Sequence, residues 1–341
     1  MDAALPLALA ATLIALGLSG DFLVRAAAPV LMRIPRAAPI ILTFSMVAWL
    51  LAVASYSLML TWIFTGPTIL SEYLTGICQR CVAAASPFHT IGGIRTGIPA
   101  VLLMLLPLAA MLVAVSLGVV KMMRDRRVTR DLAEQIIQTA TPTAIGGHRV
   151  MLINTAEIVA YSLPRAYGGI VLSTGVIQLL NSEELTAVVE HENAHVQQRH
   201  HLFIAVLSIL GWPLQWIPLV RACVTAAPIY LEIASDHAAC RCTSTPALAS
   251  ALLKLGPLSS EQKRQERAPH HTRQLIPAYA TALHAAGPAR IEQLVCPARV
   301  RPALLPFAVL GIVVGTLAVA AALVQIPYLL AVFSGCPVPV H

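Results

Sequence analysis

Four long stretches of the chain are almost wholly apolar and carry no charged side chain. They are Ala3–Gly20, Ile40–Phe64, Ile98–Val120 and Ala303–Phe333. A helix needs about 20 residues to cross the hydrocarbon core of a bilayer. The pattern therefore predicts three transmembrane helices within residues 1–120, with an outer loop at 65–97. A fourth is predicted within residues 303–341, followed by a short outer tail.

Between the third and fourth spans, in residues 121–302, apolar residues occur in shorter stretches that alternate with polar ones. Residues 126–140 have helical spacing, and Pro142 predicts that this helix ends by Thr141. Three strands are expected after a turn at Gly146 and Gly147, at Arg149–Ile153, Ile158–Ser162 and Gly168–Ser173, and helical spacing returns over Thr174–Leu180. We therefore predict a mainly α membrane protein with a small α+β domain inserted before its last span.

The next helix has a clear start signal. Asn181 offers a side-chain oxygen and Glu184 a carboxylate three residues later, which is the pattern of a capping box. Downstream, one broad stripe holds Leu185, Val188, His191, Glu192 and His195, and no Pro or Gly interrupts the run to His201. A carboxylate on an otherwise inward stripe is costly unless it has a chemical role there.

The composition agrees with a membrane protein. Hydrophobic residues make up 57% of the 341 residues and charged residues 11%, with a mean hydropathy of +0.75. These values exclude an ordinary soluble domain. Twenty Arg against three Lys is typical of a GC-rich bacterial genome, so we expect a bacterial inner-membrane protein.

The basic residues predict the orientation of the spans. Three Arg residues lie between the first two spans, at positions 25, 33 and 36, and five basic residues follow the third span within residues 121–130. Because basic residues favour the cytosolic side, both termini should lie outside and residues 121–302 in the cytosol. The net charge of +7 then indicates attraction to anionic lipid. We expect no nucleic-acid binding, because no stacking aromatics accompany the basic cluster.

The cysteines divide across the membrane under this topology. Cys78, Cys81 and Cys336 should face outward, where a disulfide is possible, whereas Cys240 and Cys242 should be cytosolic and reduced. The sequence leaves open whether Cys78 and Cys81 are paired. It does not indicate an oligomeric state.

The chemistry is concentrated in the run His191-Glu192-Asn193-Ala194-His195. Two histidines four residues apart share one face of a helix, so both imidazoles can reach one Zn²⁺ ion. A carboxylate beside them, here Glu192, can act as general base for a metal-activated water in peptide hydrolysis. The motif predicts a zinc peptidase.

A third protein ligand is expected for a catalytic zinc site. The carboxylates after Glu192 are Glu232, Asp236, Glu261, Glu266 and Glu292. Glu232 is preferred because it lies in an apolar helical run, where Asp236, one turn on, can accept a hydrogen bond from a ligand histidine. His237 is a possible substitute. His201 has metzincin spacing, but Gln198 replaces the required glycine and no methionine follows Met151.

The stretch between the histidines and Glu232 constrains the topology. Leu202–Val220 is apolar over 19 residues, with Gly211, Pro213 and Pro218 inside it. A single crossing would place Glu232 on the opposite side of the membrane from His191. We therefore expect a membrane-associated segment at 202–228 in the form of a re-entrant pair, a hairpin or an interfacial helix.

Several of these motifs together resemble the BlaR/MecR-type integral-membrane metallopeptidases. The motifs are Ser173-Thr174-Gly175, Glu183-Glu184-Leu185, the His191–His195 run, Arg199-His200-His201 and the pair Glu232 and Asp236. The resemblance implies a cytosolic gluzincin fold in which His191, His195 and Glu232 bind zinc, Glu192 is the base and Asp236 orients His191. His200 and His201 are expected to be interfacial residues at the end of the helix.

The resemblance also implies a function. The substrate would be a cytosolic protein, with a transcriptional repressor as the family precedent. Only eight residues follow Phe333, so no β-lactam sensing is expected. HtpX-type quality-control peptidases use the same zinc chemistry and are the alternative. A non-catalytic zinc-binding sensor or scaffold is a third hypothesis, which the intact Glu192 disfavours.

Candidates for the oxyanion-stabilising residue are His270, His271, Arg273, Tyr279, His284 and Arg290.

Overall fold

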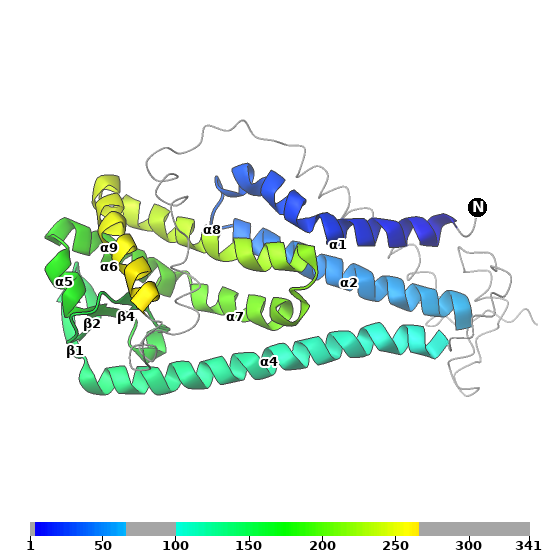
Figure 1. Cartoon of the computed structure of the whole chain (residues 1–341), viewed down its shortest axis with the longest axis horizontal. Coiled ribbons are helices and arrows are strands. Elements are labelled where there is room, and N and C mark those ends of the chain that lie inside the picture. The colour runs from blue at the N-terminus through cyan, green and yellow to red at the C-terminus, as the bar shows by residue number, and fades with distance from the viewer. Residues whose placement is uncertain (1–3, 66–99, 266–341) are drawn as a thin grey trace, which may run out of the picture.

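The computed structural model describes residues 4–65 and 100–265, and it is mostly helical with one small mixed sheet (Figure 1). The predicted fourth span, most of the predicted outer loop and the oxyanion candidates lie outside the described residues.

Two N-terminal helices, α1 (Ala4–Leu31) and α2 (Ala38–Thr65), are joined by a short turn. Within them Leu7–Leu31 and Ala38–Ser57 are long and apolar enough to cross a membrane, by length and composition alone. The first helix continues well beyond the predicted end at Gly20. Asp21 and Arg25 do not stop it, because they pair one helical turn apart at 2.7 Å on an exposed face.

The third long helix, α4 (Ala100–Thr139), joins two elements that the sequence pattern treats separately. It contains residues 100–120 of the predicted third span and residues 126–139 of the helix predicted over 126–140. No Pro or Gly lies between Lys121 and Thr139, and ion pairs four residues apart support the charged half, at 2.6 Å for Lys121–Asp125 and 2.8 Å for Arg130–Glu134. Among the described residues two helices qualify as possible spans, so four spans are not established.

The sheet has four strands in the order β1-β2-β4-β3, with β2 and β4 parallel and the outer pairs antiparallel. The strands are β1 (Thr141–Ile145), β2 (His148–Ile153), β3 (Ala160–Ser162) and β4 (Ile170–Ser173). Strand β1 differs from the sequence prediction, in which Pro142 only ends the preceding helix. It is an edge strand, where proline is tolerated. Gly146 and Gly147 turn the β1–β2 hairpin with φ of 58° and 80°.

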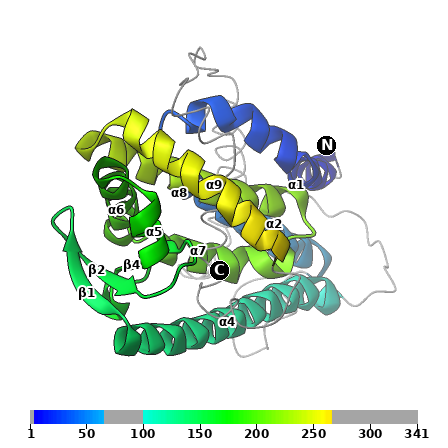
Figure 2. The same cartoon turned by 60° about the vertical axis from the view of Figure 1, so that its left-hand side comes forward.

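Helices cover both faces of the sheet. One face packs on α4 through Leu132, Ile136 and Met151. The other packs on α5 (Thr174–Leu179), α6 (Ser182–Gln197) and α9 (Thr245–Gln265), and Val150 and Leu172 lie in that core. Figure 2 shows the sheet between α4, which lies below it in this view, and α5 and α6, which lie above it. This packing fixes α6 against a rigid support.

The capping box at the start of α6 is confirmed. The Asn181 side chain accepts from the Glu184 N–H, and the Glu184 carboxylate accepts from the Asn181 N–H, both at 2.9 Å. The buried Glu184 carboxylate also accepts from Ser250 at 2.6 Å and Lys254 at 2.7 Å on α9. Hydrogen bonds from Lys254, Ser250 and Asn181 lower the pKa of Glu184 to about 2.

A helical hairpin follows α6. The helix is interrupted at Arg199, whose backbone is left-handed with φ 53° and ψ 41°. The expectation of one uninterrupted helix as far as His201 was therefore wrong. Next come α7 (His200–Gly211), the short 3-10 turn η3 (Trp212–Leu214) and α8 (Pro218–Cys242). Helix α8 packs on α1 and α2 through a buried apolar cluster that includes Leu31, Met46 and Cys223.

The Glu184 cluster predicts a defined acid response. The pKa of this carboxyl is lowered from 4.5 to about 2, so its ionised form stabilises the fold fully above pH 4.5. This contribution is lost as the pH falls from 4.5 to 2. We expect wild type to have a higher melting temperature than Glu184→Gln at pH 7, with the gap closing across that window, as measured by circular dichroism in detergent. Glu183→Gln, on an exposed residue of the same turn, is the control. A gap that persists undiminished to pH 2 would contradict the assignment.

Candidate metal centre

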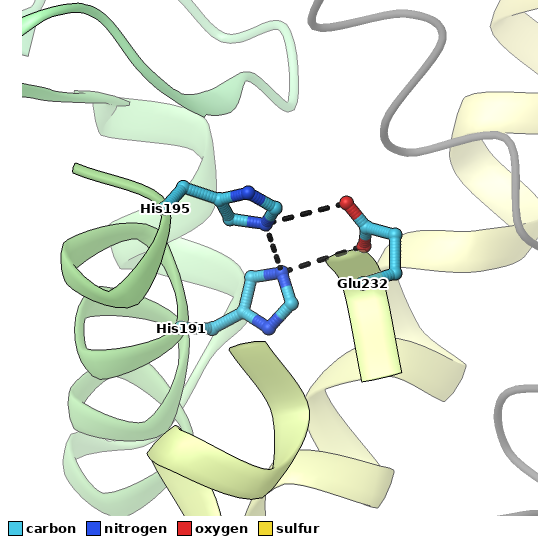
Figure 3. A group of neighbouring side chains, drawn as sticks. All are labelled: His191, His195 and Glu232. Atoms are coloured by element: carbon cyan, nitrogen blue, oxygen red, sulfur yellow. Dashed lines mark hydrogen bonds and ion pairs between the residues drawn. The ribbon is translucent and has the colours of Figure 1, made fainter. Parts of the chain in front are cut away.

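Helices α6 and α8 lie side by side and place three side chains together. His191 and His195 are one turn apart on α6, and Glu232 projects from α8 toward both rings (Figure 3). The two Nε2 atoms are 3.0 Å apart. The Glu232 carboxylate oxygens lie 3.5 Å from the Nε2 atom of His191 and 3.3 Å from that of His195.

The donor set fits a metal ion. All three residues are buried, Glu232 completely, and their ligand atoms lie within 4.8 Å of one another. Two imidazole nitrogens and one carboxylate oxygen form the ligand set of several catalytic zinc sites. A cation between the three would also neutralise a carboxylate held away from water. In the described part of the chain, this is the one group of His, Cys, Asp and Glu with metal-binding geometry.

Asp236 lies behind the first histidine. Its Oδ1 atom is 2.9 Å from Nδ1 of His191, and it is almost fully buried one turn after Glu232 on α8. A ring that donates its Nδ1–H to this carboxylate keeps a lone pair on Nε2, which faces His195 and Glu232. Asp236 therefore fixes both the orientation and the tautomer of His191.

The remaining sequence candidates do not join this group. Glu192 is buried next to His191 on α6, whereas His237 is exposed on α8. His201 is half-buried at the start of α7. Glu266 and Glu292 lie outside the described residues, and so does the side chain of Glu261.

His200 is the residue that sequence reasoning missed. It was expected at an interface, yet it is buried and its Nδ1 atom is 2.9 Å from Nδ1 of His195. The left-handed Arg199 causes this placement, because it restarts the helix and turns the next side chain back toward α6. On an unbroken helix, residue 200 would point away from the face of His195 by about 140°. Arginine has no preference for a left-handed backbone, so the local sequence gave no signal.

The protonation of His200 fits a role as hydrogen-bond acceptor. Burial, followed by the neighbouring His195, lowers the pKa of His200 to about 3, so its ring is neutral at pH 7. The Nε2 atom lies 3.3 Å from Gln198 Oε1 and can donate to it, which leaves Nδ1 as the acceptor. His195 then donates its Nδ1–H to His200 and keeps the Nε2 lone pair for a metal. Each histidine thus has its own buried acceptor.

Comparison with known proteins agrees with this geometry. Residues 122–239 match the family model described as Peptidase family M48. No curated protein and no solved structure matches the chain. The matched segment runs from the charged half of α4 through most of α8 and includes all the residues of the candidate centre. The fold and site thus define a candidate metallopeptidase. The match supports an M48-type peptidase, a metal-dependent hydrolase, and it does not extend to the narrower BlaR/MecR-type resemblance.

The His200 contact predicts a measurable effect on metal affinity. His200→Ala removes the acceptor for His195, so we expect zinc to bind about 10- to 100-fold more weakly, as is typical for the partner of a ligand histidine. His200→Asn, which can keep an acceptor near the same place, should recover most of that loss. The measurement is zinc competition against a chromogenic chelator with the full-length protein in detergent.

Two further variants calibrate this experiment. Glu232→Ala, which removes a ligand, should lose more affinity than His200→Ala, and His201→Ala, on the adjacent half-buried histidine, should lose little. Equal affinity in wild type and His200→Ala would show that the contact does not support the metal site.

Proposed function

We propose that the protein is a zinc-dependent endopeptidase of the bacterial inner membrane that cleaves a cytosolic protein. The observation that carries the proposal is the buried cluster of His191, His195 and Glu232, together with the buried Glu192 that follows His191 on α6. A structural zinc site needs no base. Glu192, which is buried and directly follows the proposed ligand His191 in the sequence, therefore favours an enzyme over a non-catalytic sensor or scaffold.

The proposed mechanism assigns a role to each side chain. His191, His195 and Glu232 would hold the metal, while Asp236 and His200 orient the two imidazoles. A bound zinc ion supplies Lewis-acid polarisation and lowers the pKa of water. Glu192 accepts the proton of the attacking water and returns it to the amine of the leaving peptide.

The proposed membrane arrangement is multi-pass with a cytosolic catalytic domain. Two apolar helices, α1 and α2, support membrane association, and the basic residues on α4 that follow Val120 support a cytosolic position for the sheet and α6.

For the substrate, we propose a transcriptional repressor, by the BlaR/MecR-type resemblance of the motifs around the site. Cleavage at many unrelated sequences would instead indicate a quality-control role of the HtpX type.

The general-base role is tested by Glu192→Gln. Loss of a positioned base should lower cleavage by roughly two to four orders of magnitude. Bound zinc should remain at the wild-type level, because this side chain is not a proposed ligand. The assay uses full-length protein in detergent and a proteome-derived peptide library read by mass spectrometry, which also reports sequence preference.

The matched control for Glu192 is Glu190→Gln. Glu190 lies on the same helix and contacts His148 at 2.9 Å instead of the metal ligands, so this variant should stay active. Wild-type cleavage by Glu192→Gln would overturn the proposed mechanism.

The orientation is tested by labelling single-cysteine variants with a membrane-impermeant maleimide. Cys242 is exposed at the end of α8 and should react only after spheroplasts are permeabilised. A variant that retains Cys78 should react in intact spheroplasts. The reverse pattern would invert the proposed topology.

A further inference from the structure

The turn between α7 and α8 is apolar and open to its surroundings. Trp216 is 78% exposed and Trp212 46% exposed, and the stretch from Leu202 to Val220 holds no charged residue. Tryptophan favours the boundary between lipid headgroups and hydrocarbon, where its apolar ring and its N–H group are both accommodated. We call the segment Gly211–Leu219 the hairpin tip.

Two glycine contacts fix the level of the hairpin tip along the long helices. Gly20 on α1 meets the backbone of Leu219, and Gly118 on α4 meets the backbone of Ile209. A Cβ atom at either glycine would overlap these neighbours. In Figure 1 the α7–α8 hairpin runs alongside α1, α2 and α4. The hairpin therefore packs at a defined position along α1 and α4.

The charges of the neighbouring helices change at that same height. Helix α1 has no charged residue before Asp21, and α4 has none before Lys121, which lies three residues or about 4.5 Å beyond Gly118. The first charged residue of α8 is the exposed Arg221. The hairpin tip therefore lies at the level where α1 and α4 change from apolar to charged residues.

We propose that the hairpin tip docks into the bilayer at the headgroup boundary of the leaflet facing the metal centre, with Trp212 and Trp216 as its anchors. Lipid is the partner. The inference rests on the membrane assignment in the proposed function and adds the position of the catalytic domain relative to the bilayer.

This docking would set the height of the metal centre. Glu232 follows Leu219 by 13 residues along α8, which corresponds to about 20 Å at 1.5 Å per residue. The headgroup layer is about 5–8 Å thick on each side of the bilayer. With α8 along the bilayer normal, the metal centre would then lie roughly 12–15 Å beyond the headgroups on the cytosolic side. It could reach cytosolic proteins and membrane-proximal loops, but no peptide bond inside the hydrocarbon core.

The test is depth-dependent quenching of tryptophan fluorescence in the full-length protein. A Trp49→Phe/Trp62→Phe variant keeps the two tip tryptophans, and a Trp212→Phe/Trp216→Phe variant keeps the other two as the matched control. Both are reconstituted into vesicles of phosphatidylcholine and phosphatidylglycerol whose acyl chains carry bromine at a shallow or a deep position. Bound zinc equal to wild type verifies that each variant is folded. If either double variant fails this criterion, single Trp212→Phe and Trp216→Phe variants replace it, and the quenching each one loses relative to wild type is measured.

We expect the tip tryptophans to lose more fluorescence to shallow bromine than to deep bromine. No quenching by either would place the tip in water, and stronger quenching by deep bromine would place it inside the hydrocarbon core. Either result overturns the proposal. Peptide cleavage measured on the same vesicles separates the two proposals. Cleavage without tip quenching rejects the docking alone, and tip quenching without cleavage rejects the peptidase assignment alone.

Discussion

His191 and His195 come from one helix and Glu232 from another, and a stretch long enough to cross a bilayer lies between them. A single metal ion requires all three on one side, so the chain must return after α6 before it can supply the third ligand. The α7–α8 hairpin provides this return. The packing of α8 on α1 and α2 through a buried apolar cluster holds the helix that carries Glu232.

The two histidines of the candidate centre are fixed by buried hydrogen-bond partners. Neither histidine can turn freely, since Asp236 holds the Nδ1 atom of His191 and His200 holds that of His195. One partner is a carboxyl group and the other an imidazole ring, so the two ligand histidines have different hydrogen-bond partners although they are neighbours on one helix. The sheet packs on α4, and the hydrogen bonds of Glu184 with Ser250 and Lys254 connect α6 to α9.

Much of the site could be predicted because it depends on residues close together in the sequence and on a residue type that is rare after Glu192. The capping box follows from residues three apart, and the scarcity of carboxylates after Glu192 narrowed the search for a third ligand to five positions. Features set by tertiary packing were missed. Strand β1 forms because an edge position tolerates Pro142, and α1 continues past Gly20 because Asp21 and Arg25 pair on its exposed side. The left-handed Arg199 has no local signal, so the position of His200 could not be foreseen.

One helix, α8, both packs on the N-terminal helices and carries Glu232, which has a consequence for biogenesis. Synthesis completes α1 and α2 first and the pair of histidines much later, and Glu232 follows His195 by another 37 residues (232 minus 195). Until α8 settles against the earlier helices, a chain would hold only two of its three ligands and would retain metal poorly. Capture of the ion would then follow the packing of α8 on α1 and α2, and a newly made chain would be unable to cut its neighbours before that contact has formed.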